Sequence, residues 1–263
     1  MRLRLVDSAA SGGGSGPGLR GALNMGIDEA LVLGLAEGSS PPTLRFYRWA
    51  PPCVSVGYFE HIEKEVDLDA AKEAGVDVLR RATAGGSVFH NAELTYSIVL
   101  PLGSPLAPLD VLESYSRICS GLVAGLSRLG VEAAFAPVND IEAGGRKVSG
   151  NAQTRKRGVL LQHGTVLLGL DLPLMFSILR VSDEKLRRKL IARAEDRITC
   201  LGSLLGREVP FGEAAAAMRE GFAAAFAAYG VELEEGELSA GERSAAAALA
   251  EGKYSSQAWN FRR

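Results

Sequence analysis

Apolar residues recur at two different spacings along the chain, and the first two-thirds carries most of the short, strand-like runs. Residues 2–6, 43–49, 53–58 and 94–100 are rich in aliphatic, β-branched and aromatic residues, and we expect strands there. Because strands and helices do not alternate strictly, the pattern favours an α+β fold, a mixed-sheet sandwich with flanking helices, over a doubly wound parallel sheet.

Helical spacing marks the other segments. Asn24 is predicted to cap a helix that ends near Leu35, since apolar residues follow it at intervals of three and four. A long amphipathic pattern ending at Gly130 predicts a second helix. Further helices are expected over 67–74, 174–179, 183–191, 211–228 and 239–251, and further strands over 76–80, 133–141, 147–150 and 158–168. Residues 8–18 are mostly Ser, Gly and Pro and predict a loop.

Composition narrows the class of protein. The 263 residues are 47% apolar and carry a net charge of −2, which predicts a packed core and argues against a nucleic-acid binder that uses a basic field. No apolar run of about 18 residues predicts a membrane span, and the N-terminus has no signal-peptide region. Three scattered cysteines and three histidines argue against a disulfide framework or a metal site, and indicate the cytoplasm.

The segment from Arg80 to His90 places two arginines before a turn of small residues. Backbone N–H groups in such a turn can bind an anion, and a guanidinium is shaped for phosphate or carboxylate. On this segment alone, a plain β-hairpin with solvated arginines is the stronger interpretation.

Lys147 lies between Gly144-Gly145 and Gly150, where glycines allow a ligand to come close. Alone, this segment also fits an ordinary hairpin tip. It is not a phosphate-binding P-loop, because Asn151 stands where that motif needs its lysine.

Together the segments resemble the lipoate–protein ligase and octanoyltransferase family, whose relatives include biotin–protein ligase. The similar blocks keep their order over almost the whole chain: Asn24–Leu31, Leu44–Tyr47, Val54–Tyr58, Arg80–His90, Glu93–Val99, Asn139–Leu168 and Lys253–Asn260.

The resemblance implies one catalytic domain over residues 1–263, without a C-terminal accessory domain, and leaves room for a separate accessory subunit as a partner. It assigns Lys147 to the carbonyl and phosphate oxygens of an acyl-adenylate. It places Asn139 and Asp140 near the nucleotide or its magnesium, and His163 at the far side of the pocket. The remaining pocket residues by resemblance are Arg81, Thr83, Gly85, Gly86, Val88, His90 and Gly150.

The first function that the resemblance implies is a lipoate–protein ligase. It would use ATP, Mg²⁺ and lipoate, and pass the lipoyl group through lipoyl-AMP to a carrier lysine in a 2-oxoacid dehydrogenase E2 or a glycine cleavage H protein. Transferases of the family that form an acyl-thioenzyme carry a cysteine shortly before the lysine segment or further on. Here Ala134–Pro137 fills the nearer stretch and Cys200 lies in an apolar segment, which favours the ligase. An octanoyl- or lipoyl-transferase between carriers, and a non-catalytic lipoyl-binding relative, stay open as alternatives.

Overall fold

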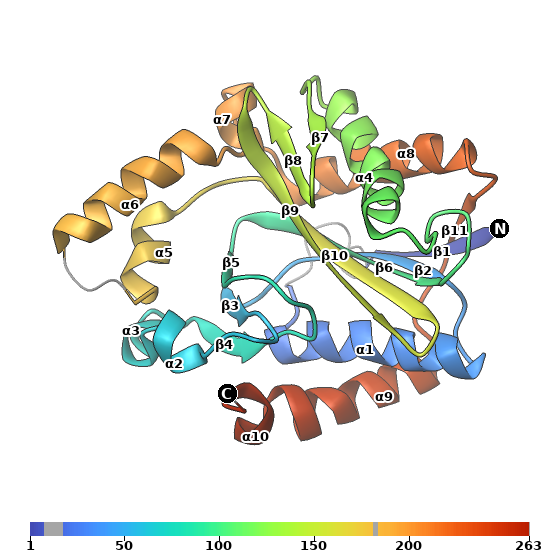
Figure 1. The fold of residues 1–263 in the computed structure, drawn as a ribbon, viewed down its shortest axis with the longest axis horizontal. Coiled ribbons are helices and arrows are strands. Elements are labelled where there is room, and N and C mark those ends of the chain that lie inside the picture. Colours follow the sequence, from blue (N-terminus) through green and yellow to red (C-terminus); the bar gives the residue numbers. More distant parts are fainter. Residues whose placement is uncertain (8–17, 181–183, 263) are drawn as a thin grey trace.

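The computed structural model describes residues 1–7, 18–180 and 184–262, so all of the predicted loop over 8–18 except Gly18 lies outside the described residues. Its strands form an eight-stranded and a three-stranded sheet (Figure 1). The strands are β1 (Arg2–Asp7), β2 (Thr43–Tyr47), β3 (Cys53–Val56), β4 (Asp77–Arg80), β5 (Val88–His90), β6 (Glu93–Pro101), β7 (Ala134–Ala136), β8 (Asp140–Ala143), β9 (Arg146–Lys156), β10 (Val159–Leu167) and β11 (Glu232–Glu235).

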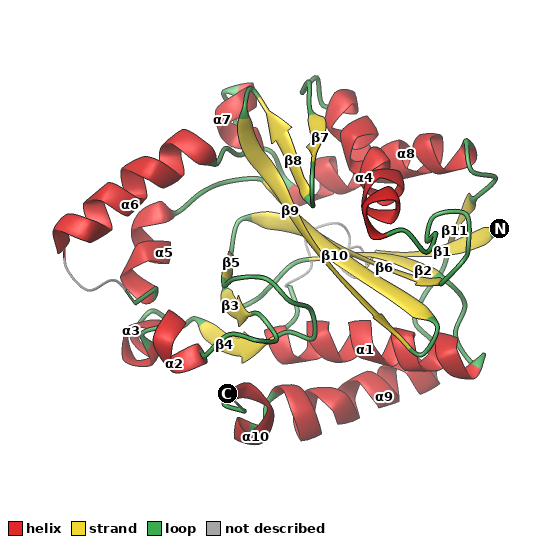
Figure 2. Cartoon of the chain, viewed as in Figure 1, coloured by secondary structure: helices red, strands yellow, loops and turns green. Residues whose placement is uncertain are grey.

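Helices cover both faces of the larger sheet (Figure 2). They are α1 (Gly21–Glu37), α2 (Ile62–Glu65), α3 (Leu68–Glu73), α4 (Val111–Arg128), α5 (Leu172–Ile178), α6 (Glu184–Arg197), α7 (Leu201–Leu205), α8 (Phe211–Ala227), α9 (Ala240–Leu249), a π-helical turn (Ala250–Tyr254) and α10 (Gln257–Asn260). Within the described ranges, none of the helices is both long enough and apolar enough to span a bilayer.

The larger sheet is mixed, in the order β11-β1-β2-β6-β10-β9-β8-β7. Strand β1 runs parallel to both of its neighbours, and the pairs from β2 to β7 are antiparallel. In the smaller sheet β3 is parallel to β4 and antiparallel to β5. The predicted α+β fold with mixed sheets and flanking helices is therefore confirmed.

The central strand β6 is buried on both faces, but the two faces differ in chemistry. Leu94, Tyr96 and Ile98 belong to the main core beneath α4 and α8. Glu93 and Thr95 point to the opposite face, because successive side chains of a strand alternate. That opposite face packs α1 and α9 on its apolar half. Its polar half is left for a cavity.

The start of α1 corrects one prediction. The helix begins at Gly21 after Arg20, so Asn24 lies inside it and does not cap it. The Asn24 side chain is buried and donates to the carbonyls of Leu19 and Arg48, which ties α1 to the end of β2. A polar residue ahead of an apolar pattern resembles a cap in sequence, and this one is instead a tertiary contact.

Most other element predictions are confirmed. Helix α4 begins after Asp110, whose carboxylate accepts from the Glu113 amide, and its turn ends at Gly130 as expected. The strand predicted over 133–141 is wrong in one respect, since two antiparallel strands, β7 and β8, occupy this region.

Candidate active site

A cavity of about 430 Å³ lies on the polar half of the sheet face that α1 covers. This volume falls within the range of about 300–1,000 Å³ that is usual for small-molecule sites. The cavity reaches from Tyr47 on β2 to Lys147 on β9. Because β6 and β10 lie between those strands, the cavity crosses three strand spacings, or about 14 Å.

The two ends of the cavity differ in exposure. Tyr47, Met25 and Trp49 close one end and are 1%, 2% and 6% exposed. At the other end the Lys147 side chain is 39% exposed and Leu170 is 38% exposed. The cavity is therefore a slot with a closed inner end and an open mouth at the lysine.

Lys147 is held at this mouth by its backbone and its charge. Its carbonyl accepts from the Thr199 amide at 2.8 Å, and its Nζ lies 2.7 Å from Asp140 Oδ1. Gly150 leaves room for this side chain, because a Cβ at that position would lie 2.7 Å from Nζ and 2.6 Å from Cε. The Asp140 carboxylate therefore holds the end of the lysine side chain in place.

Arg81 lies beneath the turn that the sequence marked as an anion site. It is 5% exposed, and its guanidinium donates to the carbonyls of Ala84 and Gly86, to the Ser55 carbonyl, and to Thr83 Oγ1. The protein itself uses these donors to shape the turn. Burial lowers the pKa of Arg81 to about 10, so it stays charged at neutral pH.

The turn after Arg81 also depends on two glycines. Gly85 has a φ of +103°, which side chains disfavour. Gly57 lies so close to this turn that a Cβ on it would be 1.7 Å from the Gly85 carbonyl oxygen. The charge of Arg81 thus lies beneath this turn, and the nearby Glu60 carboxylate raises its pKa against the larger effect of burial.

His163 on β10 lies between a carboxylate and a hydroxyl. Its Nε2 is 2.7 Å from Thr83 Oγ1, and its Nδ1 is 3.4 Å from Asp28 Oδ2. Burial lowers the pKa of His163, so its neutral form is favoured at pH 7. Burial opposes the charge of Asp28, but hydrogen bonds from His163 and Ser97 and the charge of Arg45 outweigh it and lower its pKa.

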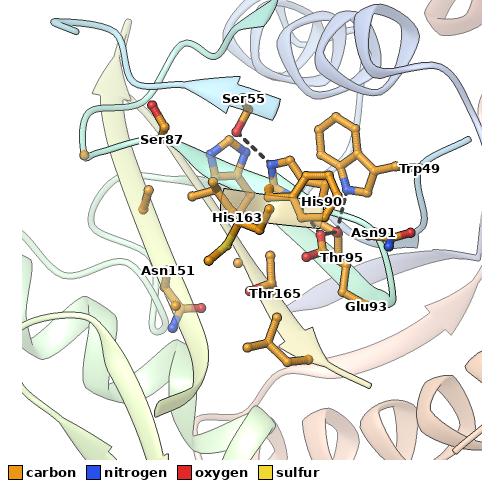
Figure 3. A pocket seen from close by; sticks show the side chains of 18 of the residues that line it. Trp49, Ser55, Ser87, His90, Asn91, Glu93, Thr95, Asn151, His163 and Thr165 are labelled. Carbon is orange, nitrogen blue, oxygen red and sulfur yellow. Dashed lines mark hydrogen bonds and ion pairs between the residues drawn. The ribbon is translucent and has the colours of Figure 1, made fainter. Parts of the chain in front are cut away.

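His90 on β5 has a parallel arrangement (Figure 3). Its Nε2 lies 2.7 Å from Ser55 Oγ, and its Nδ1 lies 2.7 Å from Glu93 Oε1. Its ring stacks on Trp49 with the centroids 4.0 Å apart. Trp49 in turn donates to Thr95, which donates to Glu93. The ring of His90 is therefore fixed in the cavity wall.

Arg81 joins the two histidine arrangements. It donates to Thr83, the hydroxyl at His163, and to Ser55, the hydroxyl at His90. The residues around His163 and those around His90 thus form one continuous hydrogen-bonded network. Such a network holds side chains in fixed positions, which a site for charge stabilisation needs.

The structure brings the residues assigned by resemblance together. Those that line the cavity are Arg81, Gly85, Gly86, Val88, His90, Asn139, Lys147, Gly150 and His163. Thr83 and Asp140 lie behind this lining and bond to His163 and Lys147 respectively. Asn139 also exchanges hydrogen bonds with Asn151 on β9.

Sequence reasoning did not assign several polar residues of the site. Polar residues recur with a period of two on β6, at Glu93, Thr95 and Ser97. This spacing could have predicted that one face of the strand is polar. Asp28 could not be found this way, because its partners Arg45 and His163 come from distant strands.

None of the three cysteines lines the cavity. Cys53, Cys119 and Cys200 are buried at 0%, 0% and 4% exposure, and none lines the cavity. Burial raises the pKa of Cys53 well above its usual value and that of Cys119 to about 12, so neither is a thiolate at neutral pH. Within the part of the chain that the structure describes, no three His, Cys, Asp or Glu side chains are grouped to hold a metal.

Comparison with known proteins gives a consistent picture. Residues 20–223 match the model of the lipoyl protein ligase A/B catalytic domain. The octanoyltransferase LipM of Symbiobacterium thermophilum is 42% identical over 92% of this chain and 95% of its own. A structure described as a bi-partite lipoate protein ligase and its E2 lipoyl domain, from Thermoplasma acidophilum, superposes with a TM-score of 0.83 at 29% identity, over 99% of this chain and 95% of that one. A lipoate-protein ligase A bound with ATP superposes with a TM-score of 0.77 at 26% identity, over 99% and 98%.

Proposed function

The chain belongs to the lipoyl protein ligase A/B catalytic domain family, and we propose that it transfers an octanoyl group from a carrier protein to a lysine of a second carrier. It is an enzyme of the lipoate ligase and acyltransferase kind. Similarity to octanoyltransferases over more than nine-tenths of both chains supports the transferase over the ligase favoured by the sequence alone. The observation that carries the proposal is the slot with a closed inner end and Lys147 at its mouth.

The slot suits an acyl chain that enters with its tail first. Its lining is mostly apolar, and each buried CH₂ contributes about 0.8 kcal/mol to binding. A chain filling the slot would leave its carbonyl at the mouth, beside the ammonium of Lys147. Attack on that carbonyl develops negative charge on its oxygen, which a fixed ammonium stabilises.

The charge of Arg81 would add to this effect. The Arg81 cation lies under Gly85 and Gly86, both of which line the slot. An anionic oxygen near this turn would therefore be stabilised by a charge that is already in place. His163 and His90 form the walls and fix the position of the acyl group.

The carrier partners follow from the same family. The Thermoplasma acidophilum neighbour is described with its E2 lipoyl domain. We therefore propose lipoyl domains of 2-oxoacid dehydrogenases and the glycine cleavage H protein as acceptors, each presenting one lysine to the mouth of the slot.

The second candidate is the ATP-dependent lipoate ligase, and one observation favours it. No cysteine lines the slot among the described residues, although a transferase that forms a thioester needs one there. The mouth would fit an acyl-adenylate: Arg81 supplies a positive charge and Gly86 leaves open space. ATP would supply the activation of the acyl carboxylate. Any magnesium would come with its phosphates, because the described residues offer no three-ligand cage.

A comparison of acyl donors separates the two candidates. The protein is incubated with an acceptor lipoyl domain and either octanoyl-loaded carrier protein, or octanoate or lipoate with ATP and Mg²⁺. The product is measured as acylated acceptor by intact mass spectrometry. Transfer from the loaded carrier without ATP supports the transferase. Transfer only in the ATP arms supports the ligase, and no acylated acceptor in any arm overturns both.

A further inference from the structure

We propose that a second groove, next to the slot, docks the carrier protein that donates the acyl group, and that this partner presents an acidic face with an apolar centre. The inference rests on the proposed transfer from a loaded carrier, and it names the surface that would recognise that carrier. The groove has a volume of about 440 Å³ and lies between the start of α4, the end of β9 and the turn at Tyr58. We call it the outer groove.

The outer groove arises because two neighbouring strands differ in length. Strand β8 pairs with β9 only as far as Gly150, whereas β9 continues to Lys156 beside β10. The last residues of β9 line the groove along an edge that no other described strand covers. Ala84 lines both the outer groove and the slot, so the turn after Arg81 lies between the two.

Large apolar side chains are exposed around the outer groove. Phe59 and Val111 line it, and Phe59 is 59% exposed. Leu109 is 77% exposed, and its carbonyl accepts from Arg155, which joins the start of α4 to β9. Exposed apolar side chains that gather at one groove, in contrast to single ones scattered over a surface, mark a contact surface for a partner.

Cations flank this apolar centre. Lys156 and Arg157, at the tip of the β9–β10 hairpin, are exposed and belong to no ion pair within the described ranges. The Lys156 Nζ lies 5.2 Å from the centroid of the Tyr58 ring, and the guanidinium carbon of Arg262 lies 4.5 Å from the same centroid. Aromatic and arginine side chains are enriched in protein interfaces.

The carboxylates near the outer groove already have partners. Asp110 accepts from the Glu113 amide as the N-cap of α4, and Glu113 pairs with Arg117. Glu60, which follows Phe59, lies close enough to Arg81 to raise its pKa. Lys156 and Arg157 are therefore left for carboxylates or phosphates of a partner, and an acidic face complements them.

The distance from Lys147 indicates which of the two carriers the surface fits. The stretch from Gln153 to Lys156 follows Lys147 in the same strand and lies about 20–30 Å from it. An acceptor lysine has a short aliphatic stem, so its domain must sit at the mouth of the slot itself. A donor that holds its acyl thioester on a long, flexible, phosphate-linked arm can dock its body at this distance and still reach the slot.

Docking at the outer groove has a kinetic consequence. Charges at the edge of an interface mainly raise the association rate and make it depend on ionic strength, because salt screens exposed charges. The outer groove is therefore expected to raise kcat/KM for a loaded carrier without changing the chemistry at Lys147.

Charge reversal at the hairpin tip tests this consequence. Lys156→Glu combined with Arg157→Glu is expected to lower kcat/KM for the octanoyl-loaded carrier by about 10-fold or more at low salt, with the difference lost at high salt. With octanoyl-pantetheine, a thioester without a carrier body, kcat/KM should stay within about twofold of the native value, as should KM for the acceptor domain. Lys72→Glu on α3 is the matched control, because Lys72 is exposed and lines neither cavity.

Two kinetic results would overturn the docking surface. One is an equal kcat/KM for the loaded carrier in the native enzyme and in the charge-reversed variant. The other is a raised KM for the acceptor domain with no change for the loaded carrier, which would assign the surface to the acceptor.

A binding titration separates this proposal from the proposed function. A donor carrier that holds octanoate through a stable amide in place of the thioester is titrated by fluorescence anisotropy. We expect the charge-reversed variant to raise the dissociation constant by about 10-fold, and Phe59→Ala to raise it while leaving its salt dependence unchanged.

Absence of binding to the native protein, or equal binding by all variants, would overturn the docking surface even where acyl transfer proceeds. Binding that the charge-reversed variant loses, together with no acyl transfer from any donor, would support the docking surface and overturn the proposed transfer.

Discussion

Gly150 gives the sharpest test of the role of Lys147, because a methyl group there would push the ammonium without disturbing the fold. The Cβ of Gly150→Ala would lie 2.7 Å from Lys147 Nζ and 2.6 Å from Cε. An ordinary contact needs at least 3.4 Å, so the end of the lysine must move by about 0.7–0.8 Å. The atoms displaced are the far end of a flexible side chain, and the φ of Gly150 is not in the left-handed region.

The expected cost is one of catalysis and not of stability. A misplacement of about 1 Å can lower a rate by about 10²-fold, so Gly150→Ala is expected to lower kcat/KM by about 10-fold to 10²-fold. Removal of the charge in Lys147→Ala is expected to cost about 10²–10³-fold, the range for loss of one stabilising group at a developing oxyanion. The midpoint of thermal unfolding should stay within about 2 °C of the native value in both variants, since surface substitutions usually change stability by less than about 0.5 kcal/mol.

A double-mutant cycle decides whether the glycine acts through the lysine. In the Lys147→Ala background no long side chain remains to be displaced, so adding Gly150→Ala should change kcat/KM by less than about twofold. Gly252→Ala is the matched control, because nothing lies within 4 Å of its Cβ position and it is outside the slot. Each variant is assayed by single-turnover acylation of a lipoyl domain. An equal loss from Gly150→Ala in both backgrounds, or full activity of Gly150→Ala alone, would refute the reasoning.

Two further predictions concern the network around the slot. Gly57→Ala places a Cβ 1.7 Å from the backbone oxygen of Gly85, which cannot swing aside as a side chain can. We therefore expect the unfolding free energy, measured by urea unfolding, to fall by about 1–3 kcal/mol, and acyl binding, measured by titration with an octanoyl analogue, to weaken. Unchanged stability would show that the turn is not packed there. The pKa of His163 is lower in the folded protein than its ordinary value of 6.5, so the unfolded chain takes up the proton first and the unfolding free energy should fall as pH drops below about 6.5. His163→Gln should have a shallower slope over pH 5–7, and an identical slope in both proteins would contradict this assignment.

How much of the structure the sequence predicts depends on how far apart in the chain the interacting residues lie. The turn after Arg81 and the lysine hairpin were visible locally, since glycine spacing marks both. The orientation of the Arg81 guanidinium was not, because its acceptors include Ser55 on another strand. Asn24 shows the same limit, as a polar residue before an apolar pattern was taken for a cap and is a contact to the end of β2.

Polar residues on the face of β6 show what a pattern can and cannot provide. Period-two alternation identifies two faces of the strand from Glu93 to Pro101, one of which carries Glu93, Thr95 and Ser97. Nothing in the alternation reveals that Thr95 would meet Trp49, or that Ser97 would meet Asp28. Those pairings depend on the order of strands in the sheet, which local propensity does not determine.

The preference for a ligase over a transferase shows a different limit. The sequence shows no cysteine shortly before Lys147, and none of the three thiols lines the slot. The similarity of the whole chain to octanoyltransferases nevertheless favours the transferase.

The most direct measurement of the central claim is the intact mass of an acceptor lipoyl domain incubated with the protein and an octanoyl-loaded carrier. The account predicts one octanoyl addition, located by peptide mapping on the lipoyl lysine, formed by the native enzyme and slowed by about 10²–10³-fold in Lys147→Ala. An acceptor that stays unmodified with every donor, or is acylated equally fast by Lys147→Ala, would contradict it.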